Sequence, residues 1–189
     1  MMGDRERWNQ RWRERVGELA PPSSFVTAQD ARLPRRGRAL DVGGGAGRHA
    51  VWLARRGLDV TLVDVSDLAL ERAERRAADA GVALRLVRAD LDEDPLPDGT
   101  WDVIVAHHFL CRAQWPAFVD ALAPGGWLLL CQPTVTNLER HERPGPAYLV
   151  EPGELDRFAR GAGLAIVDSR EGWTAEDRHE AELVARRAG

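Results

Sequence analysis

The stretch Ala39-Leu-Asp-Val-Gly-Gly-Gly-Ala-Gly-Arg48 decides the fold, because alternate glycines follow an apolar strand and open a helix. Glycine adopts backbone angles that other residues avoid, and its missing side chain lets a ligand lie against the main chain. The stretch therefore predicts a cofactor loop between a strand at 38–42 and a helix at 48–56.

Two phosphate-binding loops are excluded at this position. A dinucleotide loop reads G-x-G-x-x-G, and with Gly43 and Gly45 as its first glycines the third would fall where Arg48 stands. A P-loop needs a lysine, and the sequence contains none. Asp41 would repel a pyrophosphate but suits a ligand with an ammonium or sulfonium group. These residues favour a cationic nucleoside over NAD.

Strand and helix patterns alternate along the chain. Strands are expected at 38–42, 60–64, 83–88, 101–107 and 127–131, and helices at 48–56, 67–80 and 114–122. Such alternation predicts a parallel sheet with helices on both faces. A helix at 154–161 and apolar runs at 164–168 and 181–185 predict a closing antiparallel pair. In the 67–80 helix, Arg72, Arg75 and Arg76 are expected on a solvated face.

With Asp41, Gly43, Gly45 and Gly47, the sequence resembles the class I methyltransferases, whose first motif is an acid followed by G-x-G-x-G. The resemblance covers roughly residues 36–187. It implies an α/β, Rossmann-like three-layer sandwich with a mostly parallel seven-stranded sheet and an antiparallel C-terminal strand. It also implies that the loop holds the methionine part of S-adenosyl-L-methionine (SAM), with S-adenosyl-L-homocysteine (SAH) as the product.

Further acids follow the next two strands. Asp64 occupies the place where the family's carboxylate accepts hydrogen bonds from both ribose hydroxyls. Asp90 occupies the place of the acid that binds the adenine amino group, although an acid after a strand can instead cap the next turn. The segment 101–105 running into His107, and the turn Pro124-Gly-Gly before the fifth strand, continue the resemblance.

Residues 4–19 predict an amphipathic helix with Trp8, Trp12, Val16 and Leu19 on one face. Such a face either packs on the sheet or forms a lid over the sulfonium end of the cofactor. Trp8-Asn-Gln-Arg-Trp12 is similar to the W-x-x-x-W of the thiopurine methyltransferase and tellurite-resistance branch, whose aromatic pair lies beside the cofactor. Residues 148–155 and 179–186 are also similar to segments of that branch.

These expectations divide one methyltransferase domain, 1–189, into a lid helix at 1–20, a cofactor-binding core at 36–131, a substrate loop at 132–153 and a C-terminal helix and strand pair at 154–189. No metal site is expected. The expected cofactor-binding residues are Trp8, Trp12, Asp41, Gly43, Gly45, Gly47, Asp64, Val65, Asp90, Leu91 and His107.

The catalytic group is left open by the sequence. His107 and His108 end the fourth strand, where either imidazole could act as a base, or one could pack inside while the other meets solvent. With Cys111 they also suggest a metal site, but no further ligands have a recognised spacing. Cys111 and Cys131 are expected to be buried as small hydrophobic residues. The loop at 132–153, with His141 and Tyr148, follows the fifth strand and is expected either to bind substrate or to be a simple surface loop.

Composition bounds the partners. The net charge of −4 disfavours a nucleic-acid partner. The charged start of the chain does not resemble a secretory signal, and the sequence has no run of eighteen apolar residues, so we expect a cytoplasmic protein without a membrane partner, monomeric or homodimeric.

The expected reaction is in-line methyl transfer to a small molecule: a thiol, a chalcogen oxyanion, or a nitrogen or oxygen of a metabolite. The alternatives are a methyltransferase for RNA or protein, and a non-catalytic module that keeps the fold for partner binding.

Overall fold

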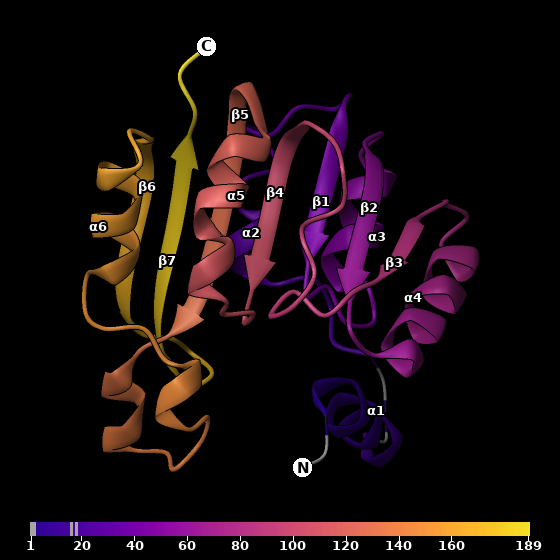
Figure 1. The fold of residues 1–189 in the computed structure, drawn as a ribbon, viewed down its shortest axis with the longest axis horizontal. Coiled ribbons are helices and arrows are strands. Elements are labelled where there is room, and N and C mark those ends of the chain that lie inside the picture. The colour runs from indigo at the N-terminus through magenta and orange to yellow at the C-terminus, as the bar shows by residue number, and fades with distance from the viewer. Residues whose placement is uncertain (1–2, 16, 18) are drawn as a thin grey trace.

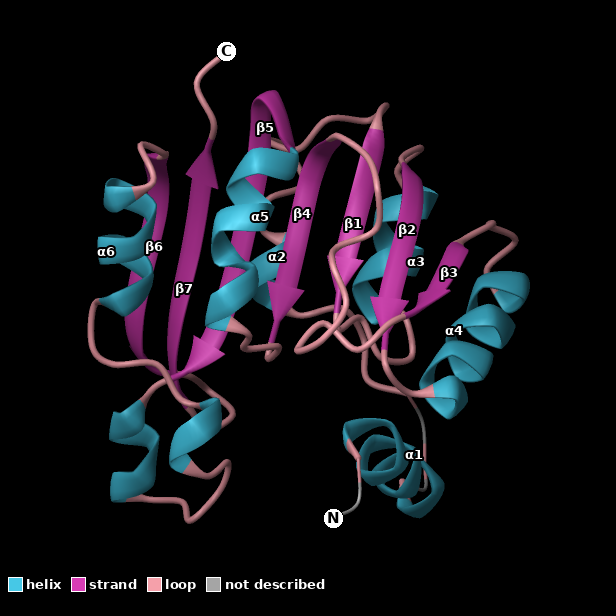
Figure 2. Ribbon diagram, viewed as in Figure 1, coloured by secondary structure: helices cyan, strands magenta, loops and turns pink. Residues whose placement is uncertain are grey.

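The computed structural model describes residues 3–15, 17 and 19–189, and its centre is a seven-stranded sheet (Figures 1 and 2). The strand order is β3-β2-β1-β4-β5-β7-β6. The strands are β1 (Arg38–Val42), β2 (Asp59–Asp64), β3 (Arg85–Arg88), β4 (Trp101–His107), β5 (Leu122–Pro133), β6 (Ala165–Trp173) and β7 (His179–Arg186). The five strands from β3 to β5 are parallel, and β7 is antiparallel to both of its neighbours. The predicted fold class is confirmed.

Helices cover both faces of the sheet, and each face has its own hydrophobic core (Figure 1). One core contains Phe118 and Leu155, from α5 and α6. The other contains Val26, Leu53 and Ala73, from α2, α3 and α4. The helices are α1 (Asp4–Glu14), α2 (Ser24–Thr27), α3 (Arg48–Arg55), α4 (Asp67–Asp79), α5 (Trp115–Ala121) and α6 (Glu154–Gly161), with 3-10 turns η1 (Arg112–Gln114), η2 (Val135–Glu139) and η3 (Pro146–Tyr148).

The parallel strands bring their carboxyl ends to one edge of the sheet. The chain passes from β1 outward to β2 and β3, then returns to place β4 on the other side of β1. Ligands of open α/β sheets bind beside such a reversal, outside the carboxyl ends of the strands. In Figure 1, α1 lies beyond this edge of the sheet, near the N-terminal end of α4.

Several expected elements differ from the structure, and three of the differences bear on the site. Helix α1 ends at Glu14 instead of residue 19, because Arg15 is already extended, and Val16 lies outside the described residues. Strand β5 begins at Leu122, since the expected Pro-Gly-Gly turn is a register irregularity within it. The irregular stretch after β5 contains η2 and η3.

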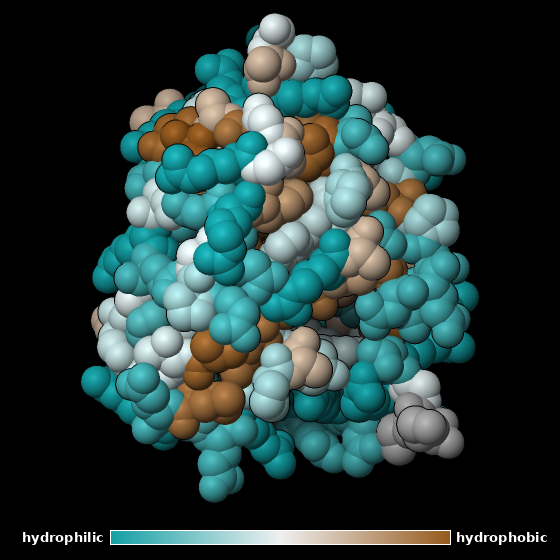
Figure 3. Space-filling view, turned by 60° about the vertical axis from the view of Figure 1, so that its left-hand side comes forward, coloured by the Kyte–Doolittle hydropathy of each residue, from teal (hydrophilic) through white to brown (hydrophobic). Residues whose placement is uncertain are grey.

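The surface in Figure 3 has its hydrophobic atoms in separate groups surrounded by hydrophilic ones. The large exposed hydrophobic residues are likewise spread over different elements; they are Leu138, Tyr148 and Val167. None of the helices in the described ranges combines the length and the hydropathy that a membrane span requires.

Candidate functional site

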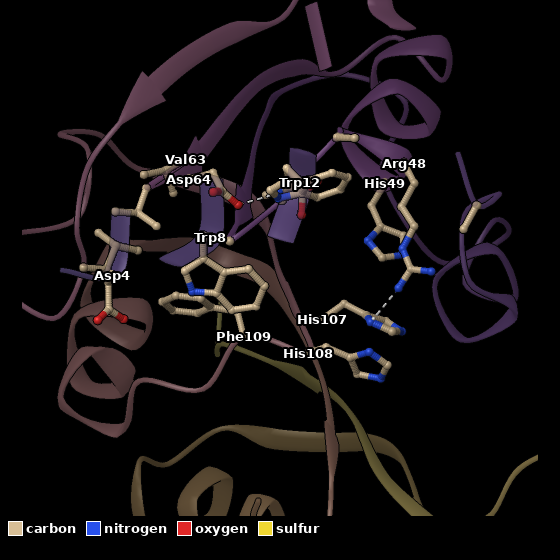
Figure 4. A pocket seen from close by; sticks show the side chains of 18 of the residues that line it. Asp4, Trp8, Trp12, Arg48, His49, Val63, Asp64, His107, His108 and Phe109 are labelled. Atoms are coloured by element: carbon tan, nitrogen blue, oxygen red, sulfur yellow. Dashed lines mark hydrogen bonds between the residues drawn. The ribbon is translucent and has the colours of Figure 1, made fainter. Parts of the chain in front are cut away.

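A cavity of about 430 Å³ opens at the carboxyl edge of the sheet (Figure 4). Its walls come from the glycine loop after β1, the ends of β2 and β4, the segment after β3, and α1. The volume falls within the range of about 300–1,000 Å³ that is usual for small-molecule sites. It has two ends, one at Asp64 and the other at His107 and His108, as Figure 4 shows; Asp90 also lines it.

The glycine loop can lie close to Phe109 and Trp12 because Gly43 and Gly45 have no side chains. A Cβ on Gly43 would stand 2.5 Å from the Phe109 ring, and one on Gly45 would stand 3.0 Å from the Trp12 ring. Both glycines have φ near +60°, which other residues seldom adopt. Gly47 differs, because it is buried against Ala73 of α4 and does not line the cavity. Its place indicates helix packing instead of ligand contact.

Asp41 reaches the cavity wall but is only 1% exposed. Its Oδ2 accepts a hydrogen bond from the main-chain N–H of Ala50, 3.0 Å away, which ties β1 to α3. Burial raises the pKa of Asp41 to about 7. A carboxyl with this pKa and this partner fixes the loop, so the sequence argument that Asp41 attracts a cation is weakened.

Asp64 stands at the carboxyl end of β2 with both oxygens held by main-chain donors. Gly45 N donates to Oδ2 at 2.9 Å, and Ser66 N donates to Oδ1 at 2.9 Å. Burial raises the pKa of Asp64, and these hydrogen bonds oppose the rise. The carboxyl group is therefore fixed in direction, with lone pairs left for ligand hydroxyls.

Asp90, Leu91 and Val65 also line this end of the cavity. The Asp90 carboxylate accepts a hydrogen bond from Asp92 N at 3.2 Å, so it caps the turn that follows β3. The capping alternative is thus realised, while a contact of Asp90 with adenine remains a prediction. Leu91 is 4% exposed and belongs to the core, so only part of it meets the cavity.

Helix α1 covers the cavity instead of packing on the sheet. Trp8 and Trp12 both line the cavity, and Trp12 is 9% exposed. Trp12 packs in a separate small cluster with Ala46 of the glycine loop and Ala69 of α4. The lid interpretation of the tryptophan face is therefore favoured over the sheet-packing one.

Polar contacts attach α1 to α4. Asn9 Oδ1 accepts from Ser66 Oγ at 2.7 Å and from Leu68 N at 3.3 Å. Arg72 donates to the carbonyl of Trp12 at 2.7 Å. The sequence did not single out Asn9, although it lies between the two tryptophans.

The expectation that the α4 arginines form a solvated face is wrong for two of the three. Arg76 donates to the carbonyl of Ala20 at 2.7 Å, and Arg72 binds the end of α1. Only Arg75 is exposed, paired with Glu71 of its own helix. The reason is that the segment following α1 runs past α4 and presents unpaired carbonyl groups to it.

His107 lies half-buried beside the Arg48 guanidinium at the other end of the cavity. Arg48 Nη2 donates to His107 Nδ1 at 2.9 Å, and the His49 ring lies 4.8 Å away between centroids. Burial lowers the pKa of His107 well below its ordinary value, with help from the neighbouring histidines and Arg48. Burial also lowers the pKa of His49 to about 3. Both rings are therefore neutral near pH 7.

His108 has a different environment from its neighbour. Its Nε2 lies 2.7 Å from Glu180 Oε1 of β7, where the Glu180 side chain is 10% exposed and that of His108 26%. Its backbone φ is +58°, and its N–H donates to the carbonyl of Cys131 at 2.8 Å. Burial acts to raise the pKa of Glu180, but the hydrogen bond and charge of His108 outweigh it, so this pKa is lowered. Glu180 was not predicted from the sequence.

The cysteines are both buried, as predicted. Cys111 donates to the carbonyl of Leu91 at 3.5 Å, and within the part of the chain that the structure describes it does not belong to a group of clustered metal-ligand atoms. Ligand-type atoms of His107, His108 and Cys131 do lie within 4.8 Å of one another. His107 Nδ1 and His108 Nε2 are nevertheless engaged by Arg48 and Glu180, and burial raises the pKa of the Cys131 thiol well above its ordinary value.

The predicted substrate loop, 132–153, lies at the correct edge of the sheet but contributes no residue to the cavity wall. Arg140 donates to Asp177 at 2.6 Å and stacks on Trp173, while His141 also contacts Asp177. The loop thus packs on the turn between β6 and β7. That turn provides the cavity residue Arg178, which the sequence did not indicate.

Comparison with known proteins identifies the family of this chain. Residues 39–126 match the family described as "Methyltransferase domain". The chain is 31% identical, over 71% of its length and 68% of the relative's, to ubiquinone biosynthesis O-methyltransferase of Thiobacillus denitrificans. The chain belongs to the class I S-adenosylmethionine-dependent methyltransferases. It is also 34% identical, over 57% of its length, to release factor glutamine methyltransferase of Neisseria gonorrhoeae, but spans only 41% of that protein.

Two solved structures share the fold. Magnesium protoporphyrin IX methyltransferase from Synechocystis PCC 6803, with bound SAH, superposes with a TM-score of 0.74 at 19% identity and 97% coverage of each chain. TehB from Haemophilus influenzae superposes with a TM-score of 0.72 at 18% identity, covering 95% of this chain and 66% of that one. At these identities the likeness concerns the fold alone.

Proposed function

We propose that this chain transfers the methyl group of SAM to a small-molecule acceptor. The observation that carries the proposal is the two-ended cavity under α1, with Asp64 at one end and two histidines at the other. A covered cavity of about 430 Å³ favours a small acceptor over a strand of RNA or a folded protein. The net charge of −4 points the same way.

The residues present fit SAM. The glycine loop lines the cavity with main chain at Gly43 and Gly45, where a Cβ would collide with Phe109 or press on Trp12, and Asp64 offers a fixed carboxylate beside it. Asp64 would hold the ribose, Asp90 the adenine, and Gly43, Gly45 and the α1 tryptophans the methionine part. When bound, SAM supplies an electrophilic methyl group on a sulfonium sulfur. The chain aligns the acceptor with this group and excludes water.

The division of the chain supports a role for each part. Residues 1–20 act as the lid, 36–131 bind the cofactor, and 154–189 complete the acceptor end through Arg178 and Glu180. The loop at 132–153 acts indirectly, by holding the turn that carries Arg178. The TehB-like fold and the Trp8 to Trp12 motif support a place in the tellurite-resistance branch.

SAH release from SAM in the presence of small acceptors tests this function. The panel contains a thiol, selenite, tellurite and a phenol, with Asp64→Ala as the inactive control. We expect acceptor-dependent SAH release by the native protein with at least one of them. Release no greater than that of Asp64→Ala with every acceptor, despite SAM binding, would contradict the proposal and leave a methyltransferase for RNA or protein and a non-catalytic module as the alternatives.

A further inference from the structure

Two adjacent histidines face the acceptor end of the cavity, and the structure distinguishes them. Arg48 can only donate hydrogen bonds, so the His107 Nδ1 that it contacts at 2.9 Å carries no proton and is already occupied. The ring is also buried between His49 and His108, with centroids 4.8 and 4.1 Å away. His107 is therefore held as a neutral wall of the cavity, without a free acceptor nitrogen at Nδ1.

His108 has the opposite arrangement. Glu180 accepts at Oε1, so the proton of the neutral ring is on Nε2, 2.7 Å away. The acceptor nitrogen is then Nδ1, which makes no hydrogen bond with the part of the chain that the structure describes. A carboxylate that fixes the tautomer and direction of an imidazole in this way prepares it to take a proton.

The backbone of His108 has an unfavourable conformation. A non-glycine residue at φ +58° lies in a sparsely populated backbone conformation, so the surrounding structure must hold it there. The hydrogen bond from His108 N to the carbonyl of Cys131 maintains it. Such conformations gather at functional sites, where surrounding structure over-determines them.

We infer that His108 is the catalytic base of the methyl transfer and that Glu180 is its positioning residue. This inference rests on the proposed function and specifies its substrate class. The acceptor is a neutral molecule with a proton to lose, such as a hydroxyl, instead of a preformed anion. The acceptor proton moves to Nδ1 of His108 while the acceptor oxygen forms a bond to the methyl carbon. The carbon–sulfur bond breaks with its electron pair left on sulfur, which gives SAH, the methylated product and a protonated His108.

The surroundings contain charges of both signs. His107, His49 and Arg48 lie on one side, Arg178 lines the same cavity, and Glu180 and Glu182 lie on β7 near Cys131. Of the two β7 carboxylates, Glu180 is the one that forms a hydrogen bond with His108. Glu182→Gln is therefore a matched control for Glu180→Gln on the same strand.

The tautomer of His108 tests the inference without an acceptor. In protein labelled with ¹⁵N-histidine and saturated with SAH, we expect a protonated Nε2 and an unprotonated Nδ1 near neutral pH. Glu180→Gln should weaken this preference, whereas Glu182→Gln should keep it. A proton on Nδ1 in the native protein would overturn the inference, because that nitrogen could not then accept one. Calorimetry with SAH distinguishes the two failures. Protein that binds SAH but carries the proton on Nδ1 contradicts only the inference, whereas protein that does not bind SAH contradicts the proposed function.

A pair of acceptors provides the kinetic test. Phenol, whose pKa is about 10, must lose its proton, whereas 4-nitrothiophenol is already a thiolate at neutral pH. His108→Asn, chosen because asparagine tolerates a positive φ, should lower kcat with phenol by about 10²- to 10⁴-fold. With the thiolate the change should be less than about threefold, and KM for SAM should stay the same. Equal losses with both acceptors, or loss of activity on metal chelation, would contradict a base and indicate a structural or metal-binding histidine. If the native protein methylates neither acceptor, the tautomer of His108 measured in the labelled protein decides whether the inference holds.

Discussion

At the scale of single residues, Asp64 connects the glycine loop to the cavity through one carboxylate. Asp64→Ala removes the acceptor of two main-chain N–H groups and the expected partner of the ribose. We expect SAH binding to weaken by about 2–3 kcal/mol, or roughly 30- to 150-fold in Kd. Calorimetry measures it, with Asp59→Ala at the exposed start of the same strand as control. Equal affinities in the two variants would move the ribose site elsewhere.

The raised pKa of Asp41 predicts an unusual pH dependence of the free energy of unfolding. Its pKa is raised from 3.8 to about 7 in the folded protein, so its contribution is fully present below about pH 4 and is lost as pH rises through 7. Relative to Asp41→Asn, the native protein should lose up to about 4 kcal/mol of unfolding free energy across this interval. Denaturant unfolding at several pH values, without ligand, gives this difference.

The comparison with Asp41→Asn is needed because His49 has the opposite effect. Its pKa is lowered from 6.5 to about 3, so its contribution is present above pH 6.5 and is lost as pH falls. The two effects partly cancel in the native protein alone. If the difference in unfolding free energy between the native protein and Asp41→Asn is the same at every pH, folding does not raise the pKa of Asp41.

The sequence predicted the roles of residues in local motifs better than the roles of residues whose contacts are distant along the chain. Gly43, Gly45 and Asp64 stand in and beside the cavity, because glycines and an acid at strand ends are local signals. The packing role of Gly47 and the burial of Asp41 depend on how α3 meets α4 and β1. Glu180 could have been noticed as an acid in an alternating strand, but its partner His108 is distant in sequence.

At the scale of secondary-structure elements, Arg72 and Arg76 fasten the end of α1 to α4. Removing both as Arg72→Ala/Arg76→Ala releases hydrogen bonds to three carbonyl groups, those of Trp12, Arg15 and Ala20. We expect SAH binding to weaken by about 5- to 30-fold, since partly exposed charged hydrogen bonds contribute about 1–2 kcal/mol here. Trypsin should also cut faster after Arg13 and Arg15.

Arg75→Ala is the matched control, because among the described residues Arg75 pairs only with Glu71, on the exposed side of the same helix. It should leave both the affinity and the rate of cleavage unchanged. The lid assignment fails if the double variant binds SAH as tightly as Arg75→Ala does.

The elements themselves followed closely from their patterns. Periodicity placed β1, β4 and α6 at their observed bounds, since each is bounded by clear breaks. The end of α1 was placed too late because its apolar spacing continues to Leu19, while the backbone becomes extended at Arg15. The sequence could not place 132–153 relative to the cavity, because position along the chain does not reveal which side of the sheet edge a loop packs against.

At the scale of the whole molecule, the strand order assembles the site. Placing β4 beside β1 brings His107 near the glycine loop, and the order β4-β5-β7 brings Glu180 beneath His108. The resemblance to class I methyltransferases implied a seven-stranded sheet, but local patterns alone give no strand order. The two-ended cavity results from this strand order. The central requirement of the proposed function is that the cavity binds an adenosyl ligand and not a dinucleotide.

Calorimetric titration of the native protein with SAH, SAM and NAD in parallel tests that requirement most directly. The account predicts micromolar binding of both adenosyl compounds at one site per chain and no detectable heat with NAD. Binding of NAD, or of neither adenosyl compound, would contradict it.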